Sequence, residues 1–228
     1  MQGKLIVFEG GEGSGKTTQI QAAYEWLLQS DRLAKLQQQG LVSQLILTRE
    51  PGGTLLGKTL RQLLLYSSEE PIADRTELLL YAADRAQHVE TCLQPLLQSG
   101  AIILCDRFTD STIAYQGYGR GLDRSLIDQL NQIATGGLQS DLTVWLEVEV
   151  TVGLDRARQR RATASMGHDR IEQSDLSFHQ RVQRGFQELA QRYPDRIVAV
   201  DASPDPDTVA QQIQTVLTQK LHHWYSRA

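Results

Sequence analysis

Five short apolar runs alternate along the chain with longer segments in which apolar residues recur every three or four positions. The runs do not alternate strictly between apolar and polar residues, which is typical of strands buried on both faces of a parallel sheet. The longer segments have the period of amphipathic helices. We expect strands at 5–8, 45–47, 102–105, 142–148 and 197–200, and helices at 17–39, 57–66, 75–98, 125–135, 152–161, 176–192 and 208–224.

This order of elements predicts a three-layer α/β fold, a parallel sheet with helices on both faces. A length of 228 residues with 40% hydrophobic residues suffices for one domain, or for one domain with a mobile flap. We find no internal repeat that would indicate another architecture.

Composition and charge exclude several classes of function. The net charge of −4 provides no basic field for nucleic acid, and no apolar run approaches the length of a membrane span. The first strand begins almost at the N-terminus, so we expect no signal peptide and place the protein in the cytoplasm. The two cysteines, Cys92 and Cys105, lie among apolar residues, and we expect both to be buried.

Residues 10–17 read Gly-Gly-Glu-Gly-Ser-Gly-Lys-Thr and lie between the first strand and a helix. This is the spacing of a P-loop, whose backbone N–H groups surround a phosphate at a helix N-terminus. Lys16 can reach the β- and γ-phosphates, and the Thr17 hydroxyl can hold Mg²⁺. The predicted ATP-binding residues are Gly10, Gly11, Glu12, Gly13, Ser14, Gly15, Lys16, Thr17 and Thr18. No guanine-selecting N-K-x-D is present, which disfavours a GTPase.

Arginines stand at the ends of the second and third expected strands. Arg49 precedes a Pro-Gly-Gly turn, and Arg107 follows Asp106 directly after Ile-Ile-Leu-Cys. Strand ends in open parallel sheets face the ligand crevice, so both guanidinium groups can hold a phosphate there, and Asp106 can contribute to a magnesium site. The alternatives are a solvated charge pair at 49–50 and a surface salt bridge at 106–107.

Tyr81 and Arg85 are four residues apart on an expected helix and share one face. A ring with an arginine one turn away suits stacking on a base and hydrogen bonding to its edge. The alternative is a core tyrosine with a surface arginine. The glycines at 117–121 do not follow a strand, so we reject a dinucleotide-binding turn and expect a loop beside the acceptor site.

Four segments occur in a fixed order: FEGGEGSGKTT at 8–18, TREPGGT at 48–54, YAADR at 81–85 and DRFTDSTIAYQG at 106–117. Together they resemble the bacterial thymidylate kinase family, over about residues 3–216. The resemblance implies the P-loop NTPase fold of the nucleoside monophosphate kinases, with a five-stranded parallel sheet. It also implies a single domain over 1–228, a mobile LID at about 153–172 and a homodimer.

The same resemblance implies ATP and dTMP as substrates, with Mg²⁺ as the cofactor. Arg49 and Arg107 would hold the dTMP phosphate, Tyr81 would stack on thymine, and Arg85 would bond its edge. Tyr115 would exclude a ribose 2′-hydroxyl. The implied dTMP-binding residues are Arg49, Tyr81, Arg85, Arg107, Ser111, Thr112, Tyr115 and Gln116, with Glu12 near the acceptor sugar.

Four arginines, Arg156, Arg158, Arg160 and Arg161, cluster at the end of one expected helix. Such a run is usually a solvated face. Phosphoryl transfer, however, requires positive charge around the migrating group, and this P-loop carries no arginine. By resemblance to family members of that kind, the LID would supply it, through Arg158 and Arg160 first and Arg170 next. The chain departs from the family in having Tyr81 where Phe is common, a longer 31–40 segment and a longer LID.

These expectations combine into direct in-line phosphoryl transfer. The expected catalytic residues are Lys16, Arg107, Arg158, Arg160 and Glu12, and the metal would be held by Thr17 and, through a water molecule, by Asp106. Another nucleoside monophosphate or deoxynucleoside kinase is the first alternative. A nucleotide-binding regulatory ATPase without an acceptor is the second.

Overall fold

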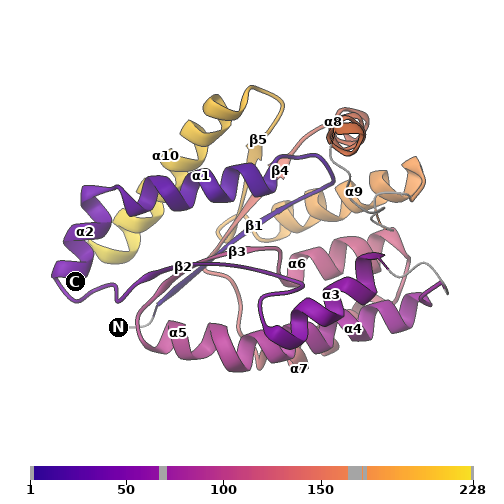
Figure 1. Cartoon of the computed structure of the whole chain (residues 1–228), viewed down its shortest axis with the longest axis horizontal. Coiled ribbons are helices and arrows are strands. Elements are labelled where there is room, and N and C mark those ends of the chain that lie inside the picture. Colours follow the sequence, from indigo (N-terminus) through magenta and orange to yellow (C-terminus); the bar gives the residue numbers. More distant parts are fainter. Residues whose placement is uncertain (1–2, 67–70, 164–170, 172–173, 227–228) are drawn as a thin grey trace.

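The computed structural model of the chain describes residues 3–66, 71–163, 171 and 174–226. Five strands form one parallel sheet in the order β2-β3-β1-β4-β5, which confirms the predicted fold class. The strands are β1 (Lys4–Gly10), β2 (Leu45–Arg49), β3 (Ile102–Asp106), β4 (Leu142–Glu147) and β5 (Ile197–Asp201). All of them run in one direction, so their carboxyl ends lie at the same edge of the sheet (Figure 1).

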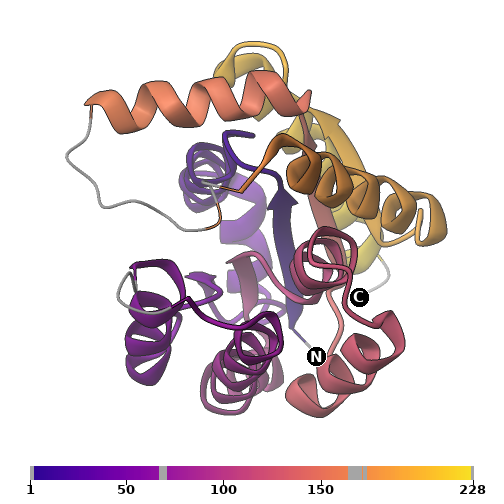
Figure 2. The same cartoon turned by 90° about the vertical axis from the view of Figure 1, so that its right-hand side faces the viewer.

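Helices cover both faces of this sheet (Figures 1 and 2). One face carries α1 (Lys16–Leu28), α2 (Asp31–Gln38) and α10 (Pro206–Tyr225). The remaining described helices are α3 (Leu55–Tyr66), α4 (Asp74–His88), π-helix η1 (Val89–Leu93), α5 (Gln94–Gln98), α6 (Thr109–Thr112), π-helix η2 (Ile113–Gly119), α7 (Arg124–Thr135), α8 (Val150–Thr163) and α9 (Leu176–Arg192). None of the described helices is both long and apolar enough to cross a bilayer.

The central strand β1 shows why its sequence is apolar without alternation. Ile6 and Phe8 pack into the cluster that includes residues of α1, α2 and α10. Leu5 and Val7 point to the opposite face and pack against η1 and α5. Since side chains of a strand alternate between faces, a strand covered on both sides is apolar on both faces, as β1 is from Leu5 to Phe8.

Three expectations about local structure are wrong. The helix expected at 17–39 is divided, because the Ser30 hydroxyl accepts a hydrogen bond from the Leu33 N–H at 3.2 Å and begins α2. The loop expected at 117–121 is largely helical. A Cβ added at Gly119 would lie 2.6 Å from the ring of Phe178, so the absence of a side chain at this position allows η2 to pack closely on α9. Cys105 is buried as expected, but Cys92 is partly exposed.

Candidate active site

The carboxyl ends of β1, β2 and β3 bring the predicted phosphate-binding groups to one place. The Lys16 ammonium group donates to the carbonyl oxygen of Gly10 at 2.8 Å, and Arg107 Nη1 donates to the same oxygen at 3.2 Å. Arg49 Nη2 lies 3.7 Å from Asp106 Oδ2, next to Arg107 in the chain. The lysine expected at the donor and the two arginines expected at the acceptor therefore lie at the same end of the sheet, not on opposite sides of it.

The loop between β1 and α1 wraps around its own lysine. Besides its bond to Gly10, Lys16 donates to the carbonyl of Gly11 at 3.0 Å, and the Ser14 hydroxyl donates to that carbonyl at 2.9 Å. Gly13 and Gly15 have φ angles of 66° and 85°, which L side chains rarely adopt. Burial, with the nearby charge of Arg107, lowers the pKa of Lys16 to about 8. A polyphosphate at this loop would restore the favourable surroundings of the ammonium charge.

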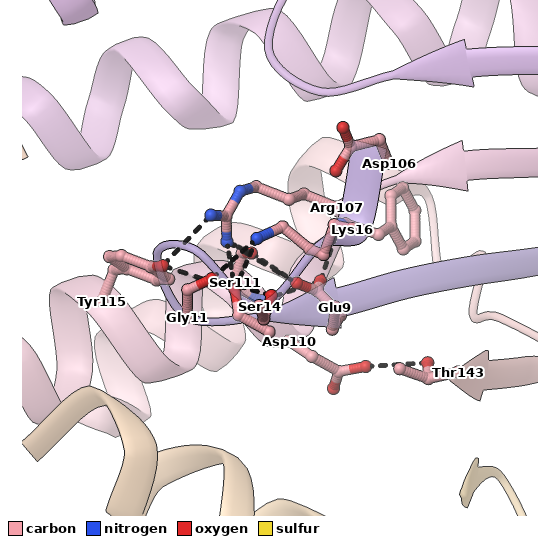
Figure 3. Close-up of polar contacts among 12 residues, drawn as sticks. Glu9, Gly11, Ser14, Lys16, Asp106, Arg107, Asp110, Ser111, Tyr115 and Thr143 are labelled. Carbon is pink, nitrogen blue, oxygen red and sulfur yellow. Dashed lines mark hydrogen bonds and ion pairs between the residues drawn. The ribbon is translucent and has the colours of Figure 1, made fainter. Parts of the chain in front are cut away.

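Arg107 is the centre of the polar network in Figure 3. Its Nη1 also donates to the Ser111 hydroxyl at 3.1 Å, and its Nη2 donates to Glu12 Oε1 and to the Tyr115 hydroxyl, each at 3.1 Å. Its φ angle is 70°, the one positive value at a non-glycine residue in the described chain. Such a backbone costs about 1–2 kcal/mol and persists where surrounding contacts enforce it. The guanidinium group is thus held beside the P-loop.

Glu12 and Tyr115 complete this side of the site. The Tyr115 hydroxyl donates to Glu12 Oε1 at 3.0 Å, and the Arg107 guanidinium lies over the tyrosine ring at 4.8 Å. Burial alone would raise the pKa of Glu12, but the charges of Arg107 and Lys16 outweigh it and lower that pKa. Burial also raises the pKa of Tyr115 well above its ordinary value. At neutral pH the site therefore holds an ionised Glu12 and a neutral Tyr115.

The sequence interpretation missed Glu9, which organises the segment after β3. Its Oε1 accepts from the N–H groups of Phe108 and Ser111 at 2.9 and 3.1 Å, and its Oε2 accepts from the Ser111 hydroxyl at 2.6 Å. Burial, together with the charge of Asp110, raises the pKa of Glu9 to about 7, although Arg107 opposes this rise. A carboxylate directly after Leu-Ile-Val-Phe was the available signal, the same signal that pointed to Asp106.

The segment after Arg107 is also fixed from the far edge of the sheet. Arg196, at the start of β5, donates from Nη1 and Nη2 to the two carboxylate oxygens of Asp110 at 2.6 and 2.8 Å. The hydroxyl of Thr143 donates to Asp110 Oδ2 at 3.1 Å. These residues are far apart in sequence, and nothing in the local pattern predicts their pairing. The bidentate pair holds α6 against the start of β5, and the Thr143 bond holds it against β4.

The residues expected to contact a base lie on α4, α6 and η2, where protein partners already engage them. Arg85 is 2% exposed and donates to Glu50 Oε2, Thr112 Oγ1, Asn131 Oδ1 and the Phe108 carbonyl at 2.8–3.0 Å. An arginine carries five N–H donors, so in the described structure one Nη2 donor remains for a ligand. Gln116 Nε2 donates one of its two N–H groups to buried Glu77 at 2.8 Å, which fixes the orientation of the amide. Tyr81 is half-buried, four residues before Arg85.

The predicted metal ligands are compatible with magnesium. Thr17 is exposed at the start of α1, and Asp106 is 8% exposed at the end of β3. Asp106 Oδ1 is buried and has no hydrogen-bond partner among the described residues. A hydroxyl and a carboxylate beside a phosphate loop match the oxygen ligands and retained waters that Mg²⁺ prefers. No group of three acidic, histidine or cysteine side chains forms an all-protein metal site in the described part of the chain.

The arginines expected in the LID fall into three situations. Arg156 donates to the carbonyls of Ala202 and Ser203 at 2.8 and 2.9 Å, so it ties α8 to the loop after β5. Arg158 and Arg160 are exposed on α8, and Arg158 pairs with Asp155 at 3.1 Å. With 3.6 residues per turn, side chains two positions apart point to different sides of a helix. Arg170 and the segment 164–170 lie outside the described residues, as does most of the expected LID after α8.

Comparison with known proteins adds independent findings. The family model described as thymidylate kinase matches residues 8–213. A thymidylate kinase of Cyanothece sp. is 62% identical over 228 residues, covering 99% of this chain and 97% of the relative. One from Acaryochloris marina is 54% identical, with coverage of 99% and 100%. The crystal structure of thymidylate kinase from Ehrlichia chaffeensis has a TM-score of 0.74 and 34% identity, and covers 96% of this chain and 100% of its own.

Proposed function

The chain belongs to the thymidylate kinase family, and from this premise we propose that it transfers the γ-phosphoryl group of ATP to dTMP. The observation that carries the proposal is the shared bonding of Lys16 and Arg107 to the Gly10 carbonyl. A lysine suited to the donor phosphates and an arginine suited to the acceptor phosphate thereby lie side by side. In-line transfer needs these two phosphates adjacent and their charges neutralised, and it needs little covalent chemistry from the protein.

In the proposed reaction the protein works by positioning and electrostatics. Lys16 holds the β- and γ-phosphates of ATP, while Arg49 and Arg107 hold the phosphate of dTMP, which is already a nucleophile. Arg107 now pairs with Glu12 at 3.1 Å, so an entering phosphate competes with that carboxylate for the guanidinium group. Freed of that contact, Glu12 is left near the acceptor sugar as a hydrogen-bond acceptor.

For the cofactor, we propose that Thr17 and, through water, Asp106 hold Mg²⁺ bound with ATP. When bound, the ion neutralises charge that develops on the β- and γ-phosphates. The orphaned Oδ1 of Asp106 supports this assignment. Arg49 lies 3.7 Å from Asp106 Oδ2. In this proposal Oδ2 pairs with the arginine, and Oδ1 is the oxygen that binds the water on the metal.

The acceptor pocket would select thymine and a deoxyribose. Tyr81 would stack on the base, and Arg85 would offer its remaining N–H to the base edge. Ser111, Thr112 and Gln116 would also line the pocket, and their contacts to Glu9, Arg85 and Glu77 fix their orientation. Tyr115, held between Arg107 and Glu12, would occupy the space of a 2′-hydroxyl. The closing LID would bring Arg158, Arg160 or Arg170 to the transferring group.

A panel of acceptors tests this function. The purified protein is assayed with Mg-ATP and dTMP, dUMP, dCMP, dGMP or thymidine, and ADP formation is measured. We expect dTMP to be preferred, with slow use of dUMP, because one methyl group contributes about 1–3 kcal/mol of discrimination. Preference for another monophosphate would identify a different nucleotide kinase. Turnover of ATP that no acceptor stimulates would instead indicate a regulatory ATPase.

We also propose that the protein acts as a homodimer in the cytoplasm, where free nucleotides are available. Large apolar side chains on α3 and α4 support a protein interface, since Leu55, Leu56, Leu63 and Leu79 are 85%, 50%, 48% and 51% exposed. Light scattering after size exclusion should give twice the mass of 25.5 kDa. A monomeric mass at micromolar concentration would contradict the dimer.

A further inference from the structure

The imidazole of His88 contacts both residues that flank Arg49. His88 lies at the end of α4 and is 0% exposed. Its Nε2 is 2.8 Å from the Thr48 hydroxyl, and its Nδ1 is 2.9 Å from Glu50 Oε1. Neither the phosphate-binding loop nor the mechanism proposed above makes use of this buried side chain.

The chemistry of the partners defines the direction of these bonds. The carboxylate of Glu50 also accepts from Arg85 Nε at 2.8 Å, so it acts as an acceptor on both oxygens. His88 therefore donates from Nδ1 to Glu50, and in the neutral imidazole Nε2 is the acceptor of the hydrogen bond from the Thr48 hydroxyl. Alternate side chains of a strand point to opposite faces. Holding Thr48 and Glu50 from one face directs Arg49 away from His88, and it is found beside Asp106.

The turn after Glu50 is built closely around the same ring. A Cβ added to Gly53 would lie 2.5 Å from His88 Nε2, so only glycine allows the loop to approach the imidazole this closely. One turn earlier on α4, Asp84 accepts from the N–H of Gly52 at 3.1 Å. The loop carrying Arg49 is thus attached to α4 by three side chains of that helix, His88, Asp84 and Arg85.

We propose that His88 is a positioning residue for the acceptor phosphate, acting through Thr48 and Glu50 to hold Arg49 in the crevice. This inference rests on the proposed function, in which Arg49 holds the phosphate of dTMP. Through Glu50, the same contacts join the arginine expected at the phosphate to Arg85, the arginine expected at the base. His88 itself does not touch substrate, and its effect should be specific for ligands that carry the phosphate.

The test measures KM for dTMP, KM for ATP and the inhibition constant of thymidine, which has the same base and sugar without the phosphate. His88→Phe fills the site but makes neither bond, and we expect it to raise KM for dTMP about tenfold. KM for ATP and the thymidine constant should stay within about twofold of wild type. Thr48→Val, an isosteric change, should raise KM for dTMP about threefold, since it removes one bond. In the double variant Thr48→Val should add nothing, because His88→Phe has already broken that contact.

Matched variants separate positioning from loss of stability. Leu217→Ala truncates a fully buried side chain in the cluster on the other face of the sheet, and it should lower the melting temperature without changing KM for dTMP. His88→Asn places an amide near the position of Nδ1 and should recover part of the dTMP affinity. If His88→Phe does not fold, KM for dTMP can still be compared with the inhibition constant of thymidine in Thr48→Val and His88→Asn.

Two results would overturn the inference. Equal weakening of dTMP and thymidine would show that His88 supports the pocket as a whole. An unchanged KM for dTMP in both His88→Asn and Thr48→Val would show that the contacts do not reach Arg49. The wild-type enzyme is assayed first. Absence of dTMP turnover would refute the proposed function and the inference together. Normal wild-type turnover, combined with an unchanged KM for dTMP in the variants, would refute the inference alone.

Discussion

Replacing Arg107 by lysine removes the geometry of the side chain and keeps its charge. The guanidinium group reaches four partners from two nitrogens, Nη1 to Gly10 and Ser111 and Nη2 to Glu12 and Tyr115. An ammonium group offers three donors from one atom and cannot span these partners while also gripping a phosphate. Losing two charge-assisted bonds costs about 3 kcal/mol at the lower end of their range, which lowers kcat/KM by a factor of about 10² to 10³.

Steady-state kinetics with varied dTMP at saturating Mg-ATP measure this loss, and a melting curve confirms that the variant is folded. Arg124→Lys is the control, because that arginine is 59% exposed, stacks on the ring of Tyr118 and lies outside the proposed machinery. Its kcat/KM should stay within about twofold of wild type. If Arg107→Lys retains kcat/KM for dTMP within about threefold, a point charge suffices and the fork geometry has no part in binding the acceptor phosphate.

Three further substitutions test other parts of the site. Lys16→Met should abolish turnover and leave the melting temperature unchanged or raised, because burial already disfavours the ammonium group and lowers its pKa to about 8; wild-type rates would exclude Lys16 from catalysis. Gly153→Ala should raise KM for ATP more than KM for dTMP, since the new Cβ would clash with the carbonyl of Glu12 in the P-loop. Equal effects on both constants would show that the substitution does not act through the P-loop. Burial, together with the charge of Glu50, raises the pKa of Asp84 to about 6. Ionisation of Asp84 therefore lowers the free energy of unfolding. This destabilisation is absent below about pH 4 and complete above about pH 6. Asp84→Asn should therefore raise the melting temperature more at pH 8 than at pH 5, and a gain independent of pH would refute that reasoning.

Local patterns were sufficient for the sheet and for the charged groups at its carboxyl edge. Arg49, Asp106 and Lys16 each follow or precede an uninterrupted apolar strand or a glycine turn, so their position relative to the sheet can be deduced from the sequence. Ser30 is a residue type that often caps a helix N-terminus, and this indicates a break in the expected helix. The apolar period continues across Ser30, so the pattern alone predicts one continuous helix.

The contacts that orient these groups could not be predicted, since they join residues distant in sequence. Asp110 and Arg196 are 86 residues apart, and Arg85 bonds Asn131 on another helix. Taken alone in the sequence, Asp110, Arg196 and Arg85 are ordinary charged residues and Asn131 is an ordinary polar one. The helical geometry of η2 was also hidden, because glycines that usually indicate a loop instead permit close approach to α9. The sequence predicts which chemical groups are present, and tertiary packing determines which of them are free for a ligand.

The balance of charge in the crevice explains why the segment after α8 should matter to the reaction. Lys16, Arg49 and Arg107 face the carboxylates of Glu9, Glu12 and Asp106, so the described site has little net charge of its own. Bound ATP and dTMP would add several negative charges in a buried place, where an uncompensated charge is costly. Mg²⁺ would offset part of this excess, and the rest would require cations from outside the sheet edge. In the proposed mechanism the arginines of the LID would supply them. α8 comes close to the P-loop at Gly153, where an added Cβ would clash with the carbonyl oxygen of Glu12. Neutralisation would then be complete only when both substrates are present, which would link closure of the proposed LID to the transfer step and would protect ATP from hydrolysis when dTMP is absent.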